Sequence, residues 1–89
     1  MGSDIVSTQK TYYSCILQLW QAFKTDLVTV QDIKSADDPR WESICDHYEK
    51  LVADAPAEVR DYADSMMRVH IYELEKCWRW KDDKQQQTA

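Results

Sequence analysis

The chain has 89 residues, of which 44% are hydrophobic and 30% are charged, and its formal net charge is −5. This length allows one domain with a single core and leaves no room for a substrate cleft between domains. No apolar run approaches the roughly 20 residues that a membrane span needs, so we expect no membrane association. The excess of acid disfavours nucleic acid as a partner.

The glycine and cysteine contents exclude several kinds of site. Gly2 is the only glycine, whereas phosphate-binding loops, dinucleotide fingerprints and tight hairpins all require glycine. The cysteines at positions 15, 45 and 77 are odd in number and too far apart for a Cys-x-x-Cys motif. We also expect no secretory signal. These features predict reduced thiols in the core of a cytoplasmic protein.

A first long helix is predicted from Ser7 or Thr8 to about Thr25, after a disordered segment of residues 1–6. Its apolar residues cover a wide arc and are Tyr12, Tyr13, Cys15, Ile16, Leu17, Leu19, Trp20, Ala22 and Phe23. Such an arc is typical of a helix that is buried on more than one side.

Residues 25–36 fit either a short helix or an extended connector. Thr29 followed three residues later by an aspartate resembles a helix-capping signal, and Val30 and Ile33 would then share the buried side. Val28 and Val30 also fit an extended segment. We favour the short helix, which would be a fourth element.

The second long helix has a clear start, because Asp37 or Asp38 can cap it and Pro39 suits its first turn. Its narrow apolar stripe comprises Trp41, Ile44, Cys45, Tyr48, Leu51 and Val52. The opposite side carries Glu42, Asp46, Glu49 and Lys50. We expect this helix to cover one side of the core and to face water on the other.

The third helix is predicted to open between Asp54 and Ala57, with Pro56 in its first turn, and to continue to about Lys81. Its wide apolar stripe comprises Val59, Tyr62, Ala63, Met66, Met67, Val69, His70, Ile71, Leu74, Cys77, Trp78 and Trp80. Residues 82–89 are predicted to form a disordered polar tail.

The predicted fold is all-α: a small antiparallel up-and-down bundle of three long helices plus the short fourth, in one domain over residues 7–81. Two of the long helices have wider apolar stripes than a closed trio of helices can bury. The excess predicts self-association or a partner helix.

No pattern in the chain points to catalysis. His70 and Glu73 are three residues apart on one helix, and Cys45 lies near His47, but neither pair has the spacing of a bundle metal site. A buried thiol is a poor nucleophile, and no loop is long enough to form an oxyanion hole. We predict no catalytic residue, no metal site and no cofactor; a metal- or thiol-dependent enzyme is kept as an alternative.

Two surfaces could bind another macromolecule. Basic residues alternate with aromatic ones around Trp78, Arg79 and Trp80, which suits stacking on nucleic-acid bases but also suits a helix C-terminus. Residues 31–64 hold ten Asp or Glu against four Lys or Arg, so the outer face of the second helix could attract a basic protein or could simply be solvated.

Tryptophan and tyrosine, which dominate interface hot spots, account for nine of the ten aromatic residues. The sequence therefore predicts a non-catalytic protein-interaction module, an acidic helical adaptor or inhibitor that binds another protein, possibly a basic one, and forms a homo-oligomer. A nucleic-acid-associated protein is the alternative. The predicted partner-binding residues are Trp20, Glu42, Asp46, Glu49, Trp78, Arg79 and Trp80.

Overall fold

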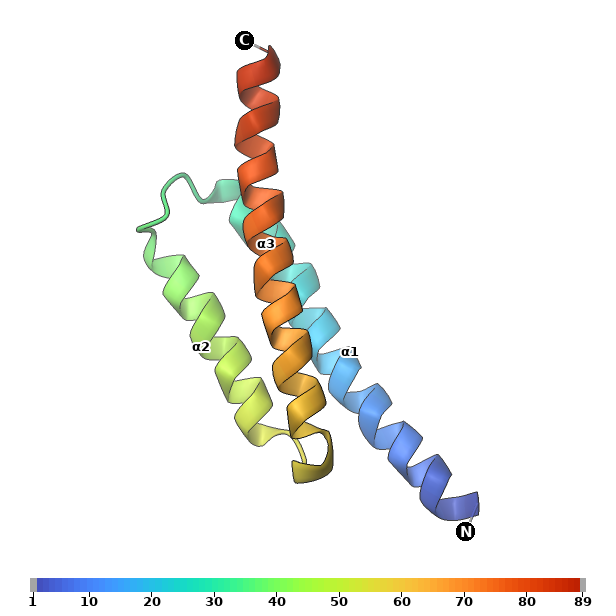
Figure 1. Cartoon of the computed structure of the whole chain (residues 1–89). Helices are drawn as coiled ribbons and strands as arrows, with labels where there is room; N and C mark the ends of the chain where they lie inside the picture. Colours follow the sequence, from blue (N-terminus) through green and yellow to red (C-terminus); the bar gives the residue numbers. More distant parts are fainter. Residues whose placement is uncertain (1, 89) are drawn as a thin grey trace.

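The structure is a computed structural model that describes the backbone of residues 2–88 and the side chains of residues 5–80. It contains α1 (Gly2–Asp32), α2 (Pro39–Asp54), a 3-10 turn η1 (Ala57–Val59) and α3 (Arg60–Thr88). α1 and α3 run in the same direction and α2 runs in the opposite one (Figure 1). Residues 2–88 contain no strand. The predicted all-α, up-and-down bundle of three long helices is confirmed.

The separate short helix predicted within residues 25–36 is wrong, because α1 continues without a break to Asp32. The hydroxyl groups of Thr25 and Thr29 donate to the carbonyls of Gln21 and Thr25, at 3.1 and 3.3 Å, and so serve the same helix. Threonine in a helix interior often bonds in this way instead of capping a new helix. The start predicted at Ser7 or Thr8 is also wrong, since α1 begins at Gly2.

The turn between α1 and α2 is held by the predicted cap. The Asp38 carboxylate accepts a hydrogen bond from the backbone N–H of Arg40 at 2.9 Å, and Pro39 occupies the first helical position. The Arg40 guanidinium donates to the same carboxylate at 2.8 Å and to the carbonyl of Asp32 at 3.2 Å. Arg40 thereby ties the end of α1 to the start of α2.

The third helix begins later than predicted, because the 3-10 turn η1 separates Pro56 from α3. Pro56 precedes the 3-10 turn η1 and does not lie in the first turn of α3. The guanidinium of Arg60 donates to the carbonyl of Ala55 at 3.0 Å, which closes the connection. A brief connection of this kind makes neighbouring helices antiparallel.

The core is a single layer of side chains between the three helices. Its largest fully buried members are Leu19, Val30, Ile33, Tyr48, Val59 and Leu74. Of the three cysteines, Cys15 is buried, while Cys45 and Cys77 are half-buried at the edges of the core.

The molecule is elongated, with extents of 61 × 24 × 17 Å. The N-terminal part of α1 diverges from the other two helices and extends past the α2–α3 turn (Figure 1). Its apolar residues Ile5 and Val6 are exposed. Where disorder was predicted, the structure instead has helix: residues 2–6 belong to α1 and residues 82–88 to α3. Met1, Ala89 and the side chains of residues 2–4 and 81–88 lie outside the described residues.

Candidate docking surface

The structure places the predicted partner-binding residues on three separate surfaces. Trp20 lies midway along α1, beside α3. Arg79 and Trp80 lie on the C-terminal part of α3, where Trp80 is 59% exposed. The acidic residues Glu42, Asp46 and Glu49 are exposed on the outer face of α2. No single partner surface contains all of them.

Trp78 is part of the bundle's packing. Its indole Nε1–H donates to the carbonyl of Ile33 at 2.8 Å, and its ring meets Trp41 edge-on, with 5.5 Å between the ring centroids. Trp78 thereby joins α3 to α2 and to Ile33, the residue that follows the end of α1. Its side chain is half-buried there.

The largest exposed apolar feature of α1 is a strip along its outer side. Val6, Tyr13, Leu17 and Trp20 are 49%, 66%, 39% and 50% exposed; these four residues are called the apolar strip below. Their spacing of seven, four and three residues places them on one side of the helix. A continuous apolar side on a folded chain is typical of a surface that contacts another molecule.

The strip is uncovered because of the way α2 packs. Ser14, Gln18 and Gln21, the polar side of α1, line clefts that they share with Leu51 of α2. Since α2 borders the polar side and α3 packs against the central line of α1, the remaining apolar side faces outward. The sequence shows that the arc is wide, but only the packing shows which part of it is exposed.

A groove between α1 and α3 adjoins the strip. It has a volume of 370 Å³ and is lined by Tyr13, Ile16, Leu17, Trp20, Met66 and His70. This set, called the α1–α3 groove below, is apolar except for the histidine. His70 is held in place by stacking on Phe23, with 4.5 Å between the ring centroids. A large apolar side chain from a partner would find both a concave seat and apolar walls here.

Behind the groove, three polar groups meet in the core, one from each helix. Asp26 Oδ2, Tyr48 Oη and His70 Nδ1 are buried without a hydrogen-bond partner among the described atoms. Burial raises the pKa of Asp26 and lowers that of His70, while burial and the nearby Asp26 carboxylate raise the pKa of Tyr48. These shifts favour a neutral tyrosine and a neutral histidine. These three atoms are sealed from solvent, although the His70 side chain also lines the α1–α3 groove.

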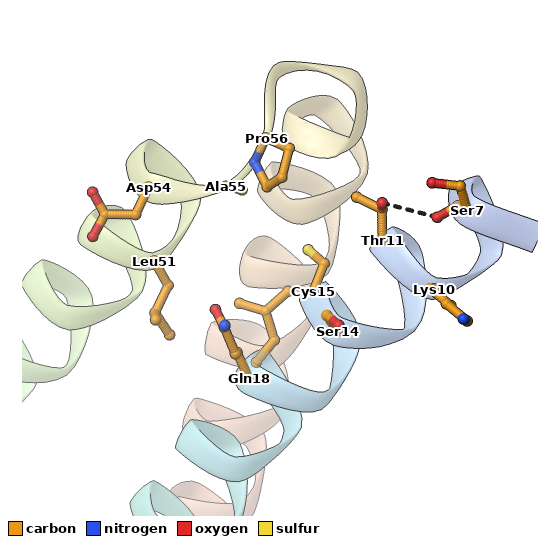
Figure 2. A pocket seen from close by; sticks show the side chains of 11 residues that line it. Ser7, Lys10, Thr11, Ser14, Cys15, Gln18, Leu51, Asp54, Ala55 and Pro56 are labelled. Carbon is orange, nitrogen blue, oxygen red and sulfur yellow. Dashed lines mark hydrogen bonds between the residues drawn. The ribbon is translucent and has the colours of Figure 1, made fainter. Parts of the chain in front are cut away.

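A second cleft lies between α1 and the α2–α3 turn. It has a volume of 390 Å³, and Cys15 lies in its wall. Figure 2 shows that the Asp54 carboxylate and the Lys10 ammonium both point away from the Cys15 thiol. Burial raises the pKa of Cys15, so the thiol stays protonated. The lining residues therefore contain no base positioned to activate this cysteine.

Metal binding and a reactive Cys45 thiol, the other chemistry that the sequence raised, have no support in the described residues. Among those residues, no group of three or more His, Cys, Asp or Glu could hold a metal ion. Burial, with Glu49, Glu75 and Asp46 adding to it, raises the pKa of the Cys45 thiol. None of the described helices is long and apolar enough to cross a membrane.

Comparison of the chain with models of protein families, with curated proteins and with solved structures found no match.

Sequence reasoning named Trp20 as a contact residue but missed its neighbours Val6, Tyr13 and Leu17. The missed signal is their spacing of seven, four and three residues up to Trp20 on one side of α1, apart from the buried line formed by Cys15, Leu19 and Ala22. Two apolar lines on one helix indicate two contacts, one inside the bundle and one outside it.

Proposed function

We propose that this chain is a non-catalytic protein-interaction module that docks through the apolar strip and the α1–α3 groove. The observation that carries the proposal is the exposure of Tyr13, Leu17 and Trp20 along one side of α1 next to an apolar groove. Aromatic side chains bury a large area at a small loss of conformational entropy, so they suit the centre of an interface.

The charge distribution supports this side of α1 over the acidic face of α2. Between Ile5 and Thr25 the only charged residues are Lys10 and Lys24. The core of a protein interface is depleted in charge, and this segment has that composition. The acidic face of α2 is a fully solvated helix surface of the ordinary kind. We further propose, from the free thiols, that the module acts in the cytoplasm.

The nucleic-acid alternative has less support. The hollow beside Trp80 is lined by Arg79 and Lys76 but also by Glu73 and Glu75. Those carboxylates would repel the phosphates that the two basic residues attract. The enzyme alternative has less support still, because the Cys15 cleft contains no base positioned to activate the thiol and the described residues contain no group that could hold a metal ion.

The test is site-specific photo-cross-linking in the cell of origin, or in any cell that expresses the chain. A photoreactive residue at Leu17 reports on the strip. The same residue at Ala53, which is exposed one helical turn after Glu49, reports on the acidic face of α2. We expect a cross-linked protein band of defined mass from position 17 and none from position 53, and we expect Trp20→Glu to remove the band.

Cross-links from position 53 alone would move the docking surface to α2 and overturn the proposal. Absence of cross-links from position 17 in the folded chain would do the same. Helical circular dichroism of each variant confirms that the fold is intact.

A further inference from the structure

The outer side of α1 has a repeat of seven residues. Alternating steps of four and three residues connect Val6, Lys10, Tyr13, Leu17, Trp20, Lys24, Leu27 and Gln31. We call these eight residues the heptad seam. All but Leu27 are exposed, and Leu27 is half-buried where the seam turns toward the core. A spacing of 3.5 residues is the pattern by which one helix packs along another in a coiled coil.

The two sets of seam positions differ in chemistry. The first set, seven residues apart, is Val6, Tyr13, Trp20 and Leu27. The second set is Lys10, Leu17, Lys24 and Gln31. The first set is entirely apolar or aromatic, whereas the second alternates between a lysine or glutamine and a leucine. Lysine at such positions is known to select register and orientation at some expense of stability.

We propose that a second copy of this chain occupies the heptad seam, with the two α1 helices packed antiparallel around a twofold axis. This inference rests on the proposed function, because it names the occupant of the same surface. The twofold axis makes the interface isologous, so each copy supplies the same strip and the same groove.

The antiparallel register follows from the spacing. Reversing one helix exchanges the order of its three- and four-residue steps, so the seams mesh only when the first set of one copy faces the second set of the other. Centring the pair on Leu17 and Trp20 places Leu17 opposite Trp20 of the second copy. Tyr13 then faces Lys24 of the second copy, where the ammonium can lie over the aromatic ring.

Size and charge also fit this register. Trp20 of the second copy lies at the level of the α1–α3 groove, which gives its indole ring an apolar seat beside Met66. No lysine of the seam directly faces another lysine. A parallel pair in register would instead place Lys10 against Lys10 and Lys24 against Lys24, which like-charge repulsion disfavours.

The seam is long enough for a stable pair. From Val6 to Gln31 it extends about 38 Å at the usual helical rise. That length covers three and a half heptads, near the number that a coiled coil requires. The N-terminal part of α1 diverges from α2 and α3 (Figure 1), and seven of the eight seam residues are exposed.

The test measures molecular mass by sedimentation equilibrium over a series from about 1 μM to about 1 mM protein. We expect a monomer–dimer equilibrium for the natural chain. Leu17→Glu should lower the association constant by about 100-fold or more, because it places an unpaired charge against Trp20 of the second copy at the centre of the interface. Ala53→Glu adds the same charge on the outer face of α2 and should leave association unchanged.

Tyr13→Glu tests the orientation. In the antiparallel register the new carboxylate faces Lys24 of the second copy, so association should stay within about 10-fold of the natural chain. In a parallel register the new carboxylate faces the same carboxylate at position 13 of the second copy, and association should be lost. Circular dichroism verifies folding of each variant.

A chain that stays monomeric at about 1 mM overturns this inference. Loss of the dimer in Tyr13→Glu overturns its antiparallel orientation. If the chain is monomeric but position 17 still cross-links to a different protein in cells, the proposed function stands and only the second copy is excluded. Monomer without any such cross-link overturns both.

Discussion

At the scale of single residues, Asp26 is the most costly side chain in the core. It is 9% exposed, and its Oδ2 atom has no hydrogen-bond partner among the described atoms. Burial disfavours the charged carboxylate and raises its pKa above the unfolded value. Its favourable contribution is therefore complete below the unfolded pKa and is lost as the pH rises through the folded pKa.

Asp26→Asn should accordingly stabilise the protein at pH 7 by about 1 kcal/mol or more, since the amide carries no charge. Urea unfolding followed by circular dichroism measures the difference. The gain in stability should shrink as the pH falls toward about 4, because the buried Asp26 carboxyl is then protonated and neutral like the amide of the variant. A destabilised variant at neutral pH would show that the carboxylate has a partner that stabilises its charged form.

His70 should respond to pH in the opposite direction. Burial lowers its pKa, so its contribution is complete above the unfolded pKa and is lost as the pH falls through the folded pKa. In an Asp26→Asn background, which removes the competing carboxylate, stability should fall as the pH drops below about 6.5. Adding His70→Gln should flatten that slope, and an unchanged slope would assign it to another group.

At the scale of elements, the end of the bundle depends on one side chain that links α3 to α1. Trp78→Phe keeps the aromatic contact with Trp41 but removes the hydrogen bond to the Ile33 carbonyl. We expect a loss of about 1 kcal/mol in the free energy of unfolding. Trp80→Phe is the matched control, because Trp80 is 59% exposed, and it should change stability little. Equal losses in both variants would contradict this role for Trp78.

Helix boundaries were predicted well where a side chain determines them locally. Asp38 and Pro39 fix the start of α2 through one hydrogen bond and one restricted backbone angle, and both act within three residues. α1 was predicted poorly because its threonines can either cap a helix or bond backward within one. The backward hydrogen bonds of Thr25 and Thr29 show which of the two occurs, and these bonds form only because α1 continues through both residues.

At the scale of the whole molecule, the dimer would join two chains that each carry a net charge of −5. The heptad seams also bring two lysines from each copy into one interface. Added salt screens both repulsions, over a distance of about 10 Å at 0.1 M ionic strength. Association measured by sedimentation should therefore strengthen between about 0.05 and 0.5 M sodium chloride. Weaker association at high salt would indicate contact between opposite charges.

By itself, the sequence determined the all-α class, the three long helices and the excess of apolar surface, because helical periodicity, caps and glycine content are local properties. The tertiary structure decided where that excess lies. α2 packs along the polar side of α1, and Trp78 of α3 packs against Trp41 and Ile33, while Tyr13, Leu17 and Trp20 stay exposed. Which side of a wide apolar arc is covered depends on the angle at which neighbouring helices pack, and that angle is set by all three helices together.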